Sequence, residues 1–147
     1  MYQRILVPTD GSELSRKAVD SALALAARLQ AEVVALKVVP HYPQSYFEGS
    51  APIDLQSVGQ IELQWLEAAR KVVQAVQASG EAVGVKVRAE TAMSDLVSET
   101  VLATAKRLEC DLIVMASHGR NGLKRLLLGS ETQQVLTHSH IPVLVLR

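Results

Sequence analysis

The chain has 147 residues, of which 48% are hydrophobic and 20% charged, so it is long enough and apolar enough for a globular domain with a real core. Lysine and arginine together number 15, as do aspartate and glutamate, and the net charge of zero argues against a nucleic-acid-binding protein, which usually has a basic face. The single cysteine, Cys110, excludes a disulfide within the chain and fits a reducing cytosol.

The first residues lack the hydrophobic core of a signal peptide. The longest apolar stretches are also well short of the roughly 20 residues that cross a bilayer. We therefore expect a cytoplasmic protein that does not insert into a membrane and that folds as one domain over residues 1–147.

The first third of the chain predicts a strand, a helix and a second strand. Residues 4–8 form an apolar strand that ends in a proline, and Ser12 is placed to cap a helix that runs to about residue 29. Residues 32–39 form the second strand. Residues 41–56 then predict an irregular loop, which suits either a binding loop or a tolerated surface insertion.

The middle of the chain continues the alternation of helices and strands. Residues 58–79 carry an apolar stripe at helical spacing. Residues 85–90 alternate valine or alanine with charged residues, which predicts a strand at the edge of a sheet or half exposed. A third helix begins at Ser94, and the apolar run 112–116 predicts a strand buried on both faces.

Two corners that contain glycine follow this buried strand. Gly119 ends the first corner, and Gly129 precedes a helix in which Ser130 and Gln133 fit a capping box. Glycine allows a ligand to approach the backbone and allows positive φ, and a helix N-terminus offers free N–H groups. These features suit a phosphate cradle, and ordinary turn glycines explain the same residues equally well.

The whole pattern predicts an α/β fold with an open five-stranded parallel sheet and helices on both faces, a Rossmann-like arrangement. A last strand at 141–146 has a proline near its start, which implies an edge strand or a strand start. Ligands of such sheets bind at the carboxyl ends of strands where the winding reverses. Residues 8–11 and 117–119 are the two strand ends with suitable chemistry. If those strands are neighbours, the strand order is 3-2-1-4-5 and one crevice holds both corners.

Four segments together resemble the universal stress protein family, and the resemblance covers the whole chain. The segments are residues 5–12, 111–119, 128–130 and 141–145. The ATP-binding branch of that family has a glycine, two residues, a glycine, nine residues, and then a glycine followed by serine or threonine. Gly119, Gly129 and Ser130 match this pattern. Ala116 stands at the first glycine position, where alanine allows close approach but disfavours positive φ.

This resemblance implies a regulatory protein of the stress response that binds ATP with little or no hydrolysis and so is not an enzyme. Mg²⁺ could bridge the phosphates. The implied site residues are Pro8, Thr9, Val38 and Met115 at the base, Asp10 and Ala116 at the ribose, and Gly119, Arg120, Gly129, Ser130, Glu131 and Thr132 at the phosphates. The resemblance also implies a homodimer in which the strand at 141–146 pairs across a two-fold axis.

Several alternatives remain at this point. Asp10 also suits an Asx turn, and a solvated loop charge explains Arg120 as well as a phosphate contact does. Ala116 favours a nucleotide-free dimeric interaction module of the same fold. An ATPase or pyrophosphatase would need His118, which has no serine–histidine–acid set or paired carboxylates in its pattern. A receiver domain is set aside, because Asp10 has no adjacent second acid and the third strand does not end in an aspartate.

Overall fold

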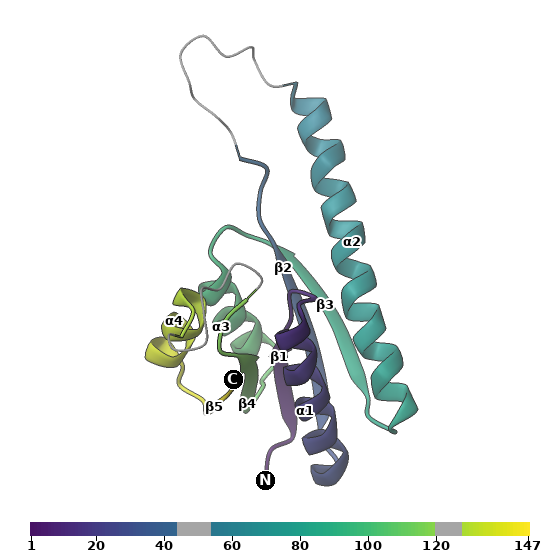
Figure 1. The fold of residues 1–147 in the computed structure, drawn as a ribbon, viewed down its shortest axis with the longest axis vertical. Coiled ribbons are helices and arrows are strands. Elements are labelled where there is room, and N and C mark those ends of the chain that lie inside the picture. The colour runs from purple at the N-terminus through teal and green to yellow at the C-terminus, as the bar shows by residue number, and fades with distance from the viewer. Residues whose placement is uncertain (44–53, 120–127) are drawn as a thin grey trace.

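The structure is a computed structural model that describes residues 1–43, 54–119 and 128–147 (Figure 1). In chain order the elements are β1 (Arg4–Pro8), α1 (Glu13–Leu29), β2 (Glu32–Val39), α2 (Leu55–Ala82), β3 (Val87–Met93), α3 (Val97–Arg107), β4 (Leu112–Ala116), α4 (Ser130–His138) and β5 (Val143–Leu146). The five strands pair in parallel in the order β3-β2-β1-β4-β5. The predicted fold class and strand order are therefore confirmed.

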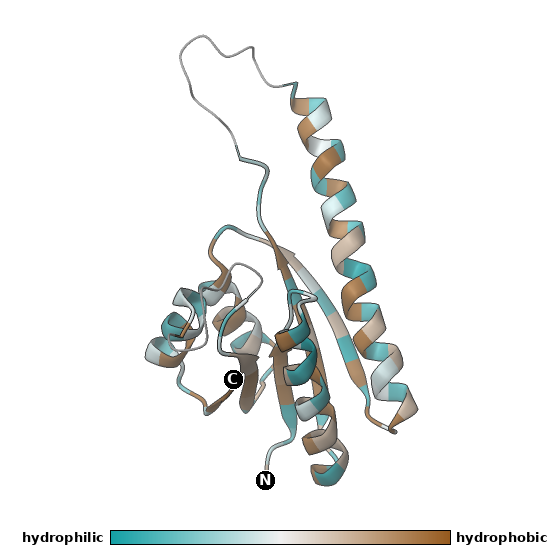
Figure 2. Cartoon of the chain, in the orientation of Figure 1, coloured by the Kyte–Doolittle hydropathy of each residue, from teal (hydrophilic) through white to brown (hydrophobic). Residues whose placement is uncertain are grey.

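Two helices cover each face of the sheet: α1 and α2 pack on one face, and α3 and α4 pack on the other (Figure 1). Because successive side chains of a strand point to opposite faces, β1 contributes to both cores. Ile5 and Val7 join the core under α1 and α2, whereas Leu6 joins the core under α3 and α4. Figure 2 shows the consequence, with hydrophobic strands at the centre and hydrophilic residues spread along the helices.

The helix α2 is longer than predicted and extends past the sheet (Figure 1). It begins at Leu55 because the side chain of Asp54 accepts a hydrogen bond from the N–H of Gln56 at 3.1 Å, so the irregular stretch ends earlier than expected. The Trp65 ring stacks on the Tyr42 ring with 5.9 Å between centroids.

Residues 44–53 of the predicted loop lie outside the described residues. No helix in the described ranges is apolar over enough of its length to cross a bilayer.

The third strand lies at a sheet edge as predicted, but it runs over Val87–Met93 rather than 85–90. Residues 83–86 instead turn the chain out of α2: Gly84 has a φ of 74°, and the N–H of Val85 donates to the carbonyl of Gly80 at 2.9 Å. The strand then continues past the alternating residues, because the whole length of β2 offers it a partner up to Val39 opposite Met93. The end of β3 is therefore set by its pairing with β2 and not by the alternation of apolar and charged residues over 85–90.

Two other boundaries also differ from the prediction. The helix α3 begins at Val97 and not at Ser94, whose hydroxyl accepts a hydrogen bond from the N–H of Leu96 at 3.1 Å. The strand β5 begins at Val143, immediately after Pro142, which has no N–H for the ladder. The carbonyl of Pro142 still accepts a hydrogen bond from the N–H of Ile113 at 3.0 Å.

Candidate functional site

A cavity of about 740 Å³ opens where the carboxyl ends of β1 and β4 meet, at the point where the winding of the sheet reverses. This volume lies within the range of small-molecule sites. All the predicted site residues that the structure describes line this cavity: Pro8, Thr9, Asp10, Val38, Met115, Ala116, Gly119, Gly129, Ser130, Glu131 and Thr132. The predicted Arg120 lies outside the described residues. The two corners that the sequence predicted to converge therefore share one cavity.

The turn after β1 directs Asp10 to this cavity. One carboxylate oxygen, Oδ1, accepts a hydrogen bond from the N–H of Ser12 at 2.8 Å, which is the Asx turn that the sequence allowed. The other oxygen, Oδ2, lies beside Gly119 on the second corner: a Cβ added to this glycine would be 2.8 Å from it. Gly11 has a φ of 79°, where a side chain would strain the turn. The turn and a role at the cavity are therefore compatible for Asp10.

A relay of hydrogen bonds behind this turn fixes its shape. The N–H of Gly11 donates to Oγ1 of Thr9 at 3.3 Å, and Oγ1 of Thr9 lies 3.0 Å from Oγ of Ser15. The hydroxyl of Ser15 in turn donates to the carbonyl of Ser12 at 2.9 Å. Thr9 and Ser15 are both buried, so the hydrogen bond between their hydroxyls is shielded from water. Sequence reasoning missed Ser15; its spacing of three residues after the N-cap was the available signal.

The second corner connects β4, β5 and α4. The N–H of Ser117 donates to the carbonyl of Leu146 at 2.7 Å, and the carbonyl of Ser117 accepts the N–H of Gly129 at 2.7 Å. A Cβ added to Gly129 would lie 3.2 Å from Cα of His118, which is tighter than an ordinary contact. The φ of Gly129 is −60°, so this glycine is required by space and not by positive φ. The sequence had allowed both reasons.

Ala116, which departs from the family pattern, is the last residue of β4. It is buried, its φ is not positive, and its carbonyl accepts a hydrogen bond from Oγ1 of Thr132 at 3.0 Å. Alanine therefore adopts this backbone without strain. The expected conflict between alanine and positive φ does not arise here.

The start of α4 differs in detail from the prediction. Gly129 is the N-cap, and the predicted capping box between Ser130 and Gln133 is wrong. The N–H of Gln133 donates to the carbonyl of Gly129 at 3.0 Å, while its side-chain amide donates to the carbonyl of Leu128 at 3.3 Å. The Gly129 N–H donates to Ser117, whereas the first-turn N–H groups of residues 130–132, which line the cavity, have no partner within the helix ladder.

The opposite end of the cavity is apolar. The strand β2 runs beyond β1, whose last residue, Pro8, pairs with Leu36. The N–H of Val33 donates on the β3 side, and the carbonyl of Leu36 accepts on the β1 side. Because the main-chain groups of successive residues alternate between the two neighbouring strands, the N–H and C=O of Val38 point to the β1 side like those of Leu36, where β1 has ended. Val38, Val97 and Met115 line this end. An apolar slot with main-chain groups at its edge suits a flat aromatic base.

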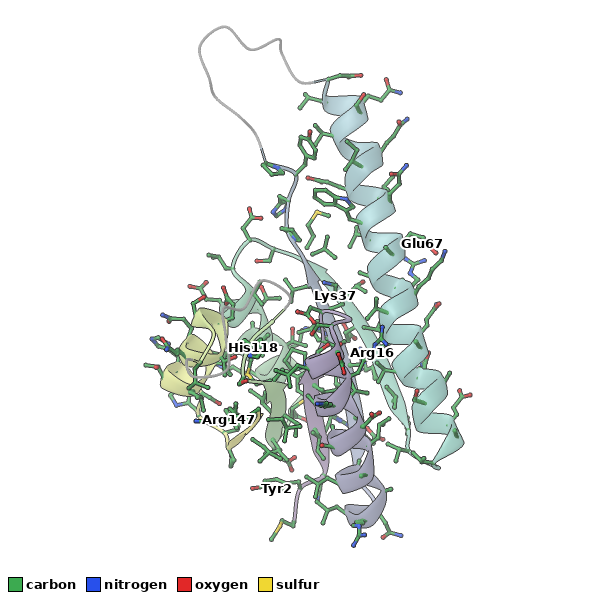
Figure 3. All side chains as sticks on the ribbon, viewed as in Figure 1. Tyr2, Arg16, Lys37, Glu67, His118 and Arg147 are labelled. Carbon is green, nitrogen blue, oxygen red and sulfur yellow. The ribbon has the colours of Figure 1, made fainter. Side chains whose placement is uncertain are left out.

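Six further residues line the cavity that the sequence did not assign to it: Ser15, Leu36, Lys37, Val97, His118 and Leu128. In Figure 3, Lys37 and His118 both lie towards the end of the sheet opposite Tyr2. The ring nitrogen Nδ1 of His118 lies 3.2 Å from Oγ of Ser117. Among the described residues, no three histidine, cysteine or acidic side chains gather as a metal site. His138, the last residue of α4, does not line the cavity, and its Nδ1 lies 3.0 Å from the carbonyl of Gln134 in the same helix.

The fold and this cavity define an α/β protein with a cavity at the switch point of its sheet, the place where ligands of such sheets bind. A sequence model described as "Universal stress protein family" matches residues 1–147, so the chain belongs to that family. Universal stress protein MJ0531 of Methanocaldococcus jannaschii is 34% identical over 147 residues, which span 100% of this chain and 83% of that protein. The resemblance drawn from four short segments is confirmed.

Solved structures agree with the family. UspA from Lactobacillus plantarum superimposes with a TM-score of 0.85 at 27% identity, over 99% of this chain and 98% of that one. The solved structure of MJ0577 superimposes with a TM-score of 0.83 at 30% identity, over 99% of this chain and 96% of that one. A universal stress protein solved in complex with cAMP shares the fold, with a TM-score of 0.68 at 22% identity over 99% of this chain and 97% of that one.

Proposed function

We propose that this protein binds an adenine nucleotide, with ATP as the ligand, and acts as a cytoplasmic regulator of the stress response. The observation that carries the proposal is that Asp10, the apolar slot at Val38 and the N-terminus of α4 all line one cavity. These groups match an acidic acceptor for sugar hydroxyls, a site for a base and donors for phosphate oxygens. One universal stress protein of this fold was solved with cAMP and another with dAMP, so adenine nucleotides occupy the fold in those proteins.

In the proposed arrangement the base lies between Val38 and Met115, with Pro8 and Thr9 at its border. Oδ2 of Asp10 accepts from a ribose hydroxyl beside Ala116. The phosphates lie at Gly119 and at the free N–H groups of residues 130–132, where the helix dipole favours negative charge. Mg²⁺ would enter with ATP and neutralise part of the phosphate charge, and Arg120 would add a positive charge.

We propose binding without turnover because each candidate general base is oriented by a partner within the protein and the remaining oxygen of Asp10 is assigned to the ribose. Oδ1 of Asp10 accepts the N–H of Ser12, and Oε2 of Glu131 accepts the N–H of Ser98 at 2.9 Å. His118 is held through Nδ1 by Ser117. Each of these groups keeps a second acceptor atom, so phosphate release from ATP tests the proposal, and release above that of a heat-treated control contradicts it.

A calorimetric titration with Mg²⁺ and ATP tests the proposal. We expect saturable heat from the parent protein and an affinity loss of about tenfold or more in Asp10→Ala, because the removed carboxylate makes a charge-assisted bond to the sugar. Asp20→Ala removes an equally charged but exposed residue from α1 and serves as the matched control. An absence of ATP heat in the parent would exclude the function and favour the nucleotide-free dimeric interaction module.

We also propose a homodimer through residues 141–146. The strand β5 is an edge of the sheet, and Leu144 on it is 43% exposed. Leu136 on the neighbouring α4 is 40% exposed. An uncovered apolar edge strand favours pairing with another chain. Size-exclusion chromatography with light scattering tests this proposal, and a monomer mass at micromolar concentration contradicts it.

A further inference from the structure

The start of α3 is capped by a residue from another helix. Leu96 occupies its N-cap position and makes no side-chain hydrogen bond to the helix. Helix starts leave backbone N–H groups without partners inside the helix. The N–H of Ser98 donates instead to Oε2 of Glu131 at 2.9 Å, across 33 residues of sequence. The first turn of α4 thus supplies the acceptor that α3 lacks.

This hydrogen bond joins the two ends of the cavity. Val97, next to Ser98, lines the apolar end, whereas Thr132, next to Glu131, lies in the first turn of α4. Thr132 also bonds to the carbonyl of Ala116 at the end of β4. Besides the bond from the Gly129 N–H to Ser117, side chains hold the N-terminus of α4 at two points, Thr132 against β4 and Glu131 against α3.

The carboxylate of Glu131 is a poor phosphate contact, because like charges repel where the phosphates are proposed to lie. Its bond to Ser98 turns the charge to the N-terminus of α3, where a helix dipole favours an anion. We infer that Glu131 is a positioning residue whose carboxylate fixes the α4 N-terminus relative to α3, and that this carboxylate does not contact phosphate. This inference rests on the proposed function and adds a role for the Glu131 side chain to the phosphate contact proposed for its N–H.

Three variants of the full chain separate this role from its alternatives. Glu131→Ala removes the acceptor, whereas Glu131→Gln removes the charge and keeps an oxygen that accepts from the Ser98 N–H. Glu99→Ala removes an exposed acid from the same first turn of α3 and leaves the Glu131 bond intact, so it is the matched control.

Hydrogen exchange of the nucleotide-free protein is the first measurement. We expect exchange at the Ser98 amide to accelerate by about tenfold or more in Glu131→Ala, since hydrogen bonds to charged groups are strong. Glu131→Gln restores most of the protection, and Glu99→Ala stays within about twofold of the parent. Unchanged exchange in Glu131→Ala overturns the inference, whether or not the protein binds ATP.

Titration with ATP and with adenosine is the second measurement. We expect Glu131→Ala to weaken ATP about fivefold or more while adenosine, which reaches only one end of the cavity, changes by about twofold or less. A general loss of folding would not distinguish the two ligands. Tighter ATP binding in both Glu131→Ala and Glu131→Gln would show that the charge alone matters and would overturn the inference. If the parent binds no ATP, the proposed function fails and the exchange result alone decides.

Discussion

Oδ2 of Asp10 and Gly119 lie so close together that a Cβ added to the glycine would be 2.8 Å from the carboxylate oxygen. These residues come from corners that are far apart in the chain, one after β1 and one after β4. The parallel pairing of β1 with β4 brings the corners together. Their contact is the structural basis of the proposed sugar site.

Gly119→Ala should therefore weaken nucleotide binding more than it lowers stability. The φ of Gly119 is not positive, so alanine does not strain the backbone, but the new methyl group must displace the Asp10 side chain. We expect ATP affinity to fall about tenfold, with a loss of stability of about 1 kcal/mol or less. Calorimetry and urea denaturation measure the two effects. An unchanged affinity would mean that Asp10 does not contact the ligand from its present position.

Two glycines of α2 should respond oppositely to alanine. Gly59 has open space around the added Cβ, so Gly59→Ala should stabilise the protein by about 0.5–1 kcal/mol through better helix propensity. At Gly80 the same Cβ would meet the Val87 side chain and would lie 2.9 Å from the carbonyl of Val85. Gly80→Ala should destabilise by about 1–3 kcal/mol through overpacking. The urea midpoints of the two variants test this pair, and a shift in the same direction contradicts it.

Thr132→Val should destabilise the protein although it conserves the size of the side chain. The Thr132 residue is only 2% exposed, and its hydroxyl donates to the carbonyl of Ala116 at 3.0 Å. Removing that donor in a buried place should cost about 1–3 kcal/mol. Thr132→Ser keeps the donor and should lose only the contribution of one methyl group, about 1 kcal/mol. Equal thermal stabilities of Thr132→Val and the parent would contradict the importance of this bond.

Cys110 should be a weakly reactive thiol in the folded protein. Burial is the largest of the effects on this thiol and raises its pKa to about 11 from its ordinary value of 9.0. Thiol reagents at about pH 8 should label it slowly until the chain is unfolded with urea, because the thiolate is the reactive form. Rapid labelling of the native protein would contradict the buried position.

The same pKa shift has a consequence for stability. Between pH 9.0 and about 11 the folded state keeps the thiol proton that the unfolded state has lost. The unfolded state therefore binds fewer protons, and the contribution of Cys110 to stability falls as pH rises. Cys110→Ala removes this contribution, so the parent should lose more stability than the variant across that window. Urea denaturation of both proteins across this pH window measures the two losses, and an equal fall in the free energy of unfolding would contradict the prediction.

Much of the fold could be predicted because the relevant signals are local. The strands 4–8 and 112–116 were both placed correctly, because residues 5–7 and 112–116 are apolar runs, as expected for strands buried on both faces. The order of the strands followed from two polar corners having to share one crevice. The ends of β3 and α3 were misplaced, because the pairing with β2 and the bond from Glu131 are interactions with distant parts of the chain.

For the candidate site, the sequence by itself determined the fold family, the two corners and the acid at the first of them, since these depend on residue type and spacing along the chain. Only the tertiary structure decided that Gly119 and Gly129 serve close packing and not positive φ, that Gly129 caps α4, and that Val97 and Lys37 join the cavity. These features depend on distances between elements far apart in sequence, which are set by how the helices pack on the sheet and not by any local pattern.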